Sequence, residues 1–392
     1  MRNLIVFVSG GQWQKPFMSY LKSKGHEIAV VNPVETPTTT LADIHIKADV
    51  HDLDAINSFI KELSPLCITS DQSDPATLVV SRLSERWGLP ANPVDTVLKL
   101  SDKVAIFRFA RSLGISVPDT ELVADAEELR CFSKKHGFPI VLKPADATMS
   151  RGFRKLTAAD EITDEMFCGC LRFSKHQKMI AQVFVDGDMV TLEGVCSSGK
   201  HRTVAMGLKT GFFKPGINSG VRYPWLSEQA PELCAVNDRY VEGTRMRFGL
   251  THAEYIIDGE NWWLIEIGGR GGGAGIADKI VPWVSGVNTY EVFYESLMGG
   301  SVDLASLKLL NRAALLRYYQ PNEVANCGNV LVSTILGTPG VAAFHPNFIG
   351  QQYVRDNYDC RHAMGIYLAE TQDDLDAVEH NIQSQLRGSI PA

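Results

Sequence analysis

The chain has 392 residues, a formal net charge of −7 at pH 7 and a hydrophobic share of 45%. A chain of this length is expected to form about two or three domains, and its composition is that of globular proteins. The sequence has no basic stripe for nucleic acid and no apolar run near the ~18 residues that span a bilayer. We therefore expect a protein that binds neither nucleic acid nor a membrane.

The cysteines bear on the cellular compartment. Eight of them are scattered through the chain, at positions 67, 131, 168, 170, 196, 234, 327 and 360. The apolar start Leu4–Val8 leads into a glycine turn, which is typical of a buried strand rather than of an export signal. We expect reduced, mostly buried thiols in a cytoplasmic protein. Cys168 and Cys170 have no second pair or histidine cluster beside them, so we expect no zinc site.

Residues 1–95 alternate apolar, β-branched stretches with helical patterns. Strands are expected at residues 4–8, 27–31 and 66–69, and helices at residues 12–24, 52–63 and 76–86. This alternation predicts a parallel sheet, whose ligands bind at the carboxyl ends of the strands. Segments 9–11 and 70–72 follow two such strands and are candidates for lining a site. For Gly10-Gly11, a tight turn without a ligand is an equal alternative.

From residue 96 the pattern changes to a mixed α+β arrangement. Ser101 is the expected N-cap of a helix that runs to residue 113. Strands are expected at residues 140–142, 180–185, 189–196, 253–257 and 262–267. Further strands are expected at residues 313–319, 329–335 and 366–369, and Thr371 is expected to cap a last helix to residue 385. We therefore predict an α/β and α+β fold with three domains, at residues 1–95, 96–305 and 306–392.

Lys143 directly follows the apolar stretch at residues 140–142. An ammonium group at the end of a buried strand must be satisfied by an anion or by water. The small residues at 145–153 follow, and such a loop can fold over phosphates and donate its backbone N–H groups. The loop has a single glycine, Gly152, so a surface loop behind a solvent-reaching lysine is the alternative.

Two glutamates lie in a predicted hairpin. A turn at residues 258–261 joins the strands that carry Glu254 and Glu266. Strand alternation can place both carboxylates on one face, where they repel unless they are protonated or bridged by a cation. Oxygen ligands near phosphates favour Mg²⁺. The alternative is a solvated face of an edge hairpin, which suits Glu266 poorly because Ile265 and Ile267 flank it.

Arg270 precedes the glycine-rich run at residues 271–275. So many glycines indicate a backbone that approaches a ligand closely, and a planar guanidinium group suits a carboxylate or a phosphate. The segment from Lys209 to Arg222 combines three cations with two adjacent aromatics. It is a candidate for covering the substrate, with a plain surface loop as the alternative.

With these motifs in order, the sequence resembles the ATP-grasp superfamily of carboxylate–amine ligases, and within it the L-amino acid ligases that form dipeptides. The resemblance covers nearly the whole chain. It implies an N-terminal parallel α/β domain, a central ATP-grasp domain and a small C-terminal α+β domain. It also implies ATP and Mg²⁺ as cofactors, with Mn²⁺ as an alternative ion. The implied nucleotide-binding residues are Lys103, Lys143, Ser150, Arg151, Gly152, Gln182, Val183, Phe184, Val185 and Asp188.

The resemblance assigns further roles around the reacting groups. Glu254 and Glu266 match the magnesium ligands, and Lys143 and Arg270 match the catalytic residues that neutralise charge during the reaction. The implied substrate-binding residues are Glu193, Arg270, Gly272, Gly273 and Ala274. Because Ala274 stands where some dipeptide ligases carry a bulky aromatic, we expect room for a larger acyl substrate.

Three positions depart from the family pattern. Gln182 stands where the family usually has a glutamate, and Met189 where an acid is common, so that Asp188 is left to meet the ribose. Gly268 replaces an asparagine that often helps to bind a magnesium ion. The glutamate pair remains, but one family ligand is missing.

The resemblance implies a two-step reaction between a small-molecule carboxylate and an amine. The carboxylate attacks the γ-phosphate of ATP, and the amine then displaces phosphate from the acyl phosphate. A homodimer is one option for the oligomeric state. Two alternatives stay open: a purine-pathway or carboxylase-type ligase, in which Gly10 and Gly11 bind a sugar phosphate, and an ATP-binding regulator without catalysis.

Overall fold

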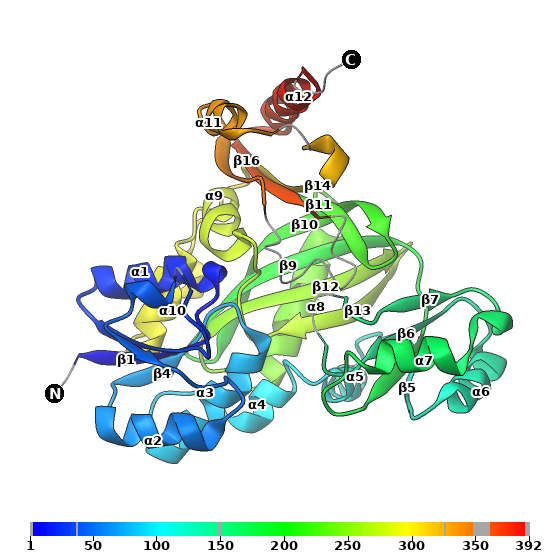
Figure 1. Ribbon diagram of the computed structural model, residues 1–392, viewed down its shortest axis with the longest axis horizontal. Helices are drawn as coiled ribbons and strands as arrows, with labels where there is room; N and C mark the ends of the chain where they lie inside the picture. Colours follow the sequence, from blue (N-terminus) through cyan, green and yellow to red (C-terminus); the bar gives the residue numbers. More distant parts are fainter. Residues whose placement is uncertain (1–2, 37, 148–149, 325–326, 348–360, 389–392) are drawn as a thin grey trace.

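A computed structural model describes residues 3–36, 38–147, 150–324, 327–347 and 361–388. Its first domain contains a four-stranded parallel sheet in the order β3-β2-β1-β4 (Figure 1). The strands are β1 (Leu4–Val8), β2 (Glu27–Val31), β3 (Ile44–Ile46) and β4 (Cys67–Thr69). The helices are α1 (Lys15–Ser23), α2 (Leu53–Leu63) and α3 (Asp74–Trp87). The predicted parallel sheet is confirmed, and β3 is a strand that the sequence pattern did not indicate.

Every residue of β1 is buried, because helices cover both faces of this sheet. Leu4 and Val6 pack with Ile56 of α2, whereas Ile5 and Phe7 pack with Phe17 of α1. This explains the unbroken apolar run at the start of the chain, since a parallel strand covered on both sides has no solvent-facing residues. The carboxyl ends of β1 and β4 therefore meet at one edge, beside the rest of the molecule (Figure 1).

A second sheet is small and antiparallel, in the order β5-β8-β6-β7. Its strands are β5 (Thr120–Val123), β6 (Ile140–Pro144), β7 (Arg154–Leu156) and β8 (Met179–Val183). Helices α6 (Ala126–His136) and α7 (Asp164–Leu171) pack against it, and α5 (Lys103–Ser112) precedes it. It forms the lobe opposite the first domain (Figure 1).

The third sheet has eight strands in the order β13-β12-β9-β10-β11-β14-β16-β15, all antiparallel. The strands are β9 (Asp188–Ser197), β10 (Lys200–Lys214), β11 (Ile217–Tyr223), β12 (Gly249–Asp258), β13 (Asn261–Gly268), β14 (Ala313–Tyr319), β15 (Val341–His345) and β16 (Ala363–Ala369). The helices that cover parts of it include α8 (Ala230–Gly243), α10 (Thr289–Leu297) and α12 (Gln372–Gly388). The strands after residue 305 continue this sheet, so the predicted second and third domains share one sheet.

Some local expectations need correction. Residues 329–335, predicted as a strand, lie in helix α11 (Asn329–Leu336), which packs on β15 and α12. Only Ile335 of α11 is fully buried, and a short apolar run does not distinguish a one-sided helix from a strand. Asp102, and not Ser101, caps α5, because its carboxylate accepts a hydrogen bond from the backbone N–H of Ala105. None of the described helices is long and apolar enough to cross a membrane.

Candidate active site

The two predicted nucleotide lysines lie close to the predicted phosphate loop. Lys143, in β6, donates from Nζ to Gln182 Oε1 at 3.0 Å. Lys103, the first residue of α5, donates from Nζ to the backbone oxygen of Ala147 at 3.0 Å. Burial, and next the charge of Lys103, lower the pKa of Lys143 from 10.5 to about 8, although Glu266 and Glu254 raise it. Two close ammonium groups, one of them held by a neutral amide, suit a polyanionic ligand.

The lowered pKa of Lys143 predicts a pH dependence of nucleotide binding. Because the folded pKa is about 8, the free protein loses this ammonium charge as the pH rises through 8. We expect ATP to bind about tenfold more weakly at pH 9 than at pH 7, measured by titration calorimetry. Lys143→Met should remove this dependence. An affinity of the unmodified protein that stays constant from pH 7 to 9 would contradict the prediction.

The predicted hairpin and its shared face are present. Glu254 and Glu266 stand directly opposite each other in the β12–β13 register, next to a β-bulge. Ala253, Tyr255 and Ile267 point into the core formed with α8, so the two glutamates face the other side of the sheet. Both carboxylates thus project from neighbouring strands into the same space, at the spacing expected of a directly paired position.

Two cations accompany Glu254. Lys209 Nζ lies 2.7 Å from Glu254 Oε1, and His252 Nε2 lies 3.5 Å from the same oxygen. Burial alone would raise the pKa of Glu254, but Lys209 and His252 together bring it well below its usual range. The two cations therefore favour the ionised form of Glu254. Of the three cations in the predicted covering segment, Lys209 reaches this site, whereas Arg222 pairs with Asp376 and Glu379 of α12.

His252 continues this network to Glu193, a predicted substrate residue. His252 Nδ1 lies 2.7 Å from Glu193 Oε1, and the Tyr223 hydroxyl donates to the same oxygen at 3.2 Å. Burial lowers the pKa of His252, but Glu193 and then Glu254 raise it to about 9. The two carboxylates therefore favour the protonated form of the imidazole. The sequence contained a signal for it, because His252 lies two residues before Glu254 on the same strand face.

Arg270 forms an ion pair with a carboxylate of the first domain. Its Nε and terminal nitrogen donate to the two oxygens of Asp74 at 2.8 and 2.9 Å, a bidentate ion pair. Burial opposes ionisation of Asp74, but Arg270 lowers the pKa of this carboxyl. A Cβ atom added at Gly268 would lie 3.2 Å from Asp74 Oδ1. The position of the family asparagine therefore borders the Asp74–Arg270 pair, which local sequence patterns did not reveal.

The glycine-rich run packs against the glutamate network. A Cβ atom at Gly272 would lie 3.0 Å from Glu193 Oε2, so a side chain there would press on that carboxylate. Ala274 has a positive φ of 56° and is 8% exposed, whereas a Cβ atom at Gly273 would meet open space. The close approach expected of this backbone is thus an approach to Glu193.

The remaining predicted nucleotide residues lie on the small sheet and its borders. Ser150 donates from Oγ to the Gly216 backbone oxygen at 2.9 Å, and Arg151 and Gly152 lie in the same turn; residues 148 and 149 of this loop fall outside the described residues. Gln182 and Val183 end β8, Phe184 and Val185 follow, and Asp188 begins β9.

Hydrogen bonds limit how the predicted adenine-binding segment can act. The Val183 N–H donates to the Asp119 backbone oxygen and the Phe184 N–H to that of Pro139. Gln182 donates from Nε2 to Thr120 Oγ1 at 2.9 Å. Two of the backbone donors that a base would need are therefore engaged, which leaves the Val185 N–H and the carbonyl groups as the candidate contacts.

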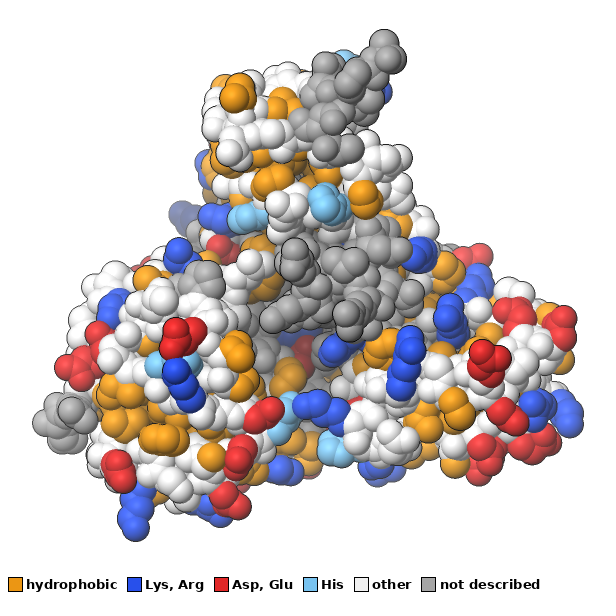
Figure 2. Space-filling model, viewed as in Figure 1, with side chains coloured by type: hydrophobic (Ala, Val, Ile, Leu, Met, Phe, Trp, Pro, Cys, Tyr) orange, Lys and Arg blue, Asp and Glu red, His pale blue; other side chains and the backbone are white. Residues whose placement is uncertain are grey.

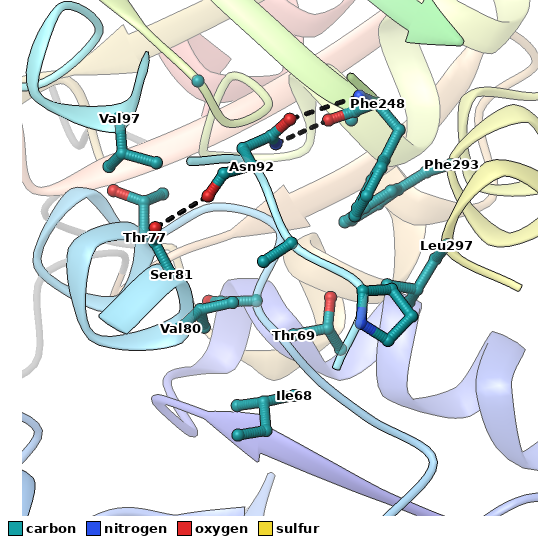
Figure 3. Close-up of a pocket in the computed structure, with 15 residues that line it drawn as sticks. Ile68, Thr69, Thr77, Val80, Ser81, Asn92, Val97, Phe248, Phe293 and Leu297 are labelled. Atoms are coloured by element: carbon teal, nitrogen blue, oxygen red, sulfur yellow. Dashed lines mark hydrogen bonds between the residues drawn. The ribbon is translucent and has the colours of Figure 1, made fainter. Parts of the chain in front are cut away.

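Figure 2 shows Lys, Arg and His side chains gathered where the first domain and the small sheet approach each other. A separate pocket lies between the first domain and the large sheet (Figure 3). Thr69, Ser70 and Thr77 contribute hydroxyl groups to its wall, and Phe248 and Phe293 contribute rings. No Lys, Arg, Asp, Glu or His lines this pocket, so it is not the site built around Lys143 and the glutamates.

The sequence comparisons are limited in extent. No protein-family model matches the chain. It is 28% identical over 111 residues to an uncharacterized protein of Sinorhizobium fredii, a match that covers 28% of this chain and only 23% of that protein. It is 22% identical over 318 residues to a formate-dependent phosphoribosylglycinamide formyltransferase of Mycolicibacterium smegmatis, over 76% of each chain.

The structural comparisons extend over nearly the whole chain. The ADP complex of an N5-carboxyaminoimidazole ribonucleotide synthetase matches with a TM-score of 0.78 at 14% identity, over 98% of this chain and 97% of the other. An L-amino acid ligase from Bacillus licheniformis matches with a TM-score of 0.76 at 14% identity, over 97% of each. At these identities the likeness defines the fold. The chain has the ATP-grasp fold, as the resemblance predicted.

Proposed function

We propose that this protein is an ATP-dependent carboxylate–amine ligase that forms an amide bond, with an amino acid among its substrates, and releases ADP and phosphate. The observation that carries the proposal is the convergence of Lys103 and Lys143 with the paired carboxylates Glu254 and Glu266. The charge of both glutamates acts on the ammonium group of Lys143, so the four side chains belong to one electrostatic site. The similarity to a ligase and a synthetase of the same fold supports this reading.

The donor set fits Mg²⁺. Glu254 and Glu266 offer oxygen ligands from directly paired positions. Among the described residues, no three His, Cys, Asp or Glu side chains form a complete metal site. A pair of carboxylates completed by phosphate oxygens is the usual arrangement for this ion. When bound, the ion would neutralise charge on the phosphates.

The residues of the chain have distinct tasks in the proposed reaction. Lys103 and Lys143 bind and orient the phosphates of ATP. A carboxylate oxygen attacks the γ-phosphorus, and the bond to ADP breaks, which gives an acyl phosphate. Arg270, aimed by Asp74, stabilises the negative oxygens of that intermediate. The amine nitrogen then attacks the acyl carbon, phosphate leaves, and the nitrogen loses a proton.

The proposal is tested by an ADP-release screen. The purified protein is incubated with ATP, Mg²⁺ and pairs of amino acids, and separately with sugar acids and amines. We expect ADP and phosphate to form in equal amounts, together with an amide product detected by mass spectrometry. Tight ATP binding without ADP release for any pair would favour the non-catalytic regulator and overturn the proposal.

The size of the acyl pocket gives a further prediction. Ala274→Trp is expected to lower ADP release with L-phenylalanine relative to L-alanine as the carboxylate. Ala274 is only 8% exposed, so a bulky ring there would have to project toward the acyl site that we propose beside Arg270. Alanine and tryptophan both carry the strain of this positive φ, about 1 kcal/mol relative to glycine, so this strain does not distinguish the variant from the unmodified protein. Ala274→Gly, which suits this backbone, is the control and should keep the original ratio. If Ala274→Trp left the ratio of ADP release with L-phenylalanine to that with L-alanine unchanged, Ala274 would not limit the size of the acyl substrate.

A second candidate function is a purine-pathway type of ligase. It is favoured by the 22% identity to a formate-dependent phosphoribosylglycinamide formyltransferase over 318 residues. The same assay separates the two, since formate or bicarbonate would then stimulate ADP formation and amino acids would not. A homodimer remains a prediction, to be checked by light scattering.

A further inference from the structure

Unpartnered polar atoms gather at one edge of the first domain. Among the described residues, buried atoms without a hydrogen-bond partner include Ser70 Oγ, Asp71 Oδ1, Gln72 Oε1 and Asp278 Oδ1. The first three follow the carboxyl end of β4, and Asp278 lies in the π-helical turn Ile276–Ile280. Buried polar groups are normally satisfied, and a π-turn inside a helical segment is often functional.

Direct contacts join the two segments. The Gly271 N–H donates to the Asp71 backbone oxygen at 2.8 Å. The backbone of Asp71 therefore lies against the residue that directly follows Arg270. The Tyr290 hydroxyl donates to Asp71 Oδ2 at 3.1 Å. The carboxyl group of Asp278 acts electrostatically on that of Asp71. The cluster therefore adjoins the proposed reaction site and is separate from Lys143 and the glutamate pair.

Apart from the Ser70 hydroxyl, the donors of this cluster are used, whereas three of its acceptors are free. Gln72 Nε2 donates to the Trp13 backbone oxygen and to Asp71 Oδ2, at 2.9 and 3.0 Å. What remains open is Asp71 Oδ1, Gln72 Oε1 and Asp278 Oδ1, all acceptors. Asp71 is 1% exposed, while Gln72 and Asp278 are partly exposed. Three acceptors without donors match in number the three N–H donors of an ammonium group.

We propose that Asp71, Gln72 and Asp278 bind the primary ammonium group of a substrate. Which substrate carries this ammonium group depends on the proposed ligase function. The preference of the three acceptors for an ammonium group does not depend on it. The ammonium group belongs either to the amine that attacks the acyl phosphate or to an amino acid that supplies the carboxylate. Both sources present the same group to the same acceptors, and the kinetic arm of the test separates them.

The charge state of Asp71 agrees with a binding role. Burial raises the pKa of Asp71 from 3.8 to about 7, and Asp278 adds to this effect. Since the folded pKa lies above the unfolded one, the group costs stability as the pH rises from about 4 to 7. Asp71→Asn should therefore fold and melt at a higher temperature at pH 8. A carboxyl group that destabilises the fold is typical of a functional site.

The binding test uses glycinamide hydrochloride, an ammonium ligand without a carboxylate, on the full chain without ATP. We expect saturable binding by calorimetry, weakened at least tenfold in Asp71→Asn and in Asp278→Asn. Asp238→Asn is the matched control and should bind normally, because Asp238 lies on α8 and its carboxylate is hydrogen-bonded to His201 and Thr203 of β10. No binding, equal binding in all variants, or equal binding of potassium chloride would overturn the proposal.

The kinetic arm uses ADP release by the same variants with the best substrate pair from the screen. A tenfold rise in the KM of the amine assigns the ammonium group to the nucleophile, and the same rise for the amino-acid carboxylate assigns it to that substrate. The KM of ATP should not change. If neither KM rises, the inference fails even though the enzyme is active. If the unmodified protein releases no ADP, the proposed function fails while the glycinamide result stands.

Discussion

Glu266→Gln is expected to lower ADP formation at least 100-fold at saturating ATP. The amide keeps the shape of the side chain but removes the negative charge that a magnesium ion requires. Glu266 lies opposite Glu254 and its charge acts on Lys143, so the change acts at the centre of the proposed site. The measurement is a coupled ADP assay across a range of Mg²⁺ concentrations.

The hairpin offers its own control for this variant. Glu260 lies in the exposed turn between β12 and β13, and Glu260→Gln should leave ADP formation within about twofold of the original rate. Thermal melts of both variants should agree with that of the unmodified protein within a few degrees. Near-normal ADP formation in Glu266→Gln would exclude this residue as a metal ligand. The hairpin would then not be the magnesium site.

Lys143→Met is expected to weaken ATP binding by roughly 30- to 150-fold, because a hydrogen bond from a charged group contributes about 2–3 kcal/mol. The variant should not destabilise the fold. The Lys143 ammonium group lies over the Phe107 ring and beside a neutral amide, and desolvation and the charge of Lys103 lower its pKa to about 8. Methionine keeps most of the side-chain volume and removes the buried charge.

Weaker ATP binding together with unchanged stability would show that Lys143→Met affects binding and not the fold. Calorimetric titration with a non-hydrolysable ATP analogue measures affinity, and a thermal melt at pH 7 measures stability. Lys178→Met, at an exposed position before β8, is the control and should bind ATP normally. ATP affinity unchanged in Lys143→Met would contradict the role of Lys143 at the phosphates.

Local sequence patterns predicted the parts of the site that lie on one hairpin. The turn at residues 258–261 and the alternation around it were enough to place Glu254 and Glu266 on one face. The same reasoning applies to β1, whose apolar run is explained by helices on both sides. Periodicity and turn chemistry act within a few residues, and these features depend on nothing more distant.

Contacts between distant segments could not be predicted in this way. Asp74 and Arg270 are 196 positions apart, and Glu193 and His252 are 59 apart. Each pairing exists because separate elements pack together, so no local pattern around either residue indicates its partner. The error at residues 329–335 has a different origin. An apolar run that packs on one side only, with Ile335 as its buried contact, has no periodicity long enough to separate a helix from a strand.

The Asp74–Arg270 contact bears on how modular this chain is. Asp74 begins α3 in the first domain, whereas Arg270 follows the last strand of the hairpin in the large sheet. In the proposed reaction, the guanidinium group would thus take its orientation from a domain that need not touch ATP. A chimera with a foreign first domain would keep the two lysines and the two glutamates of the proposed site. It would lack Asp74, the residue that orients the Arg270 side chain. Exchange of substrate-binding domains between such proteins would therefore have to transfer that carboxylate together with the helix that carries it.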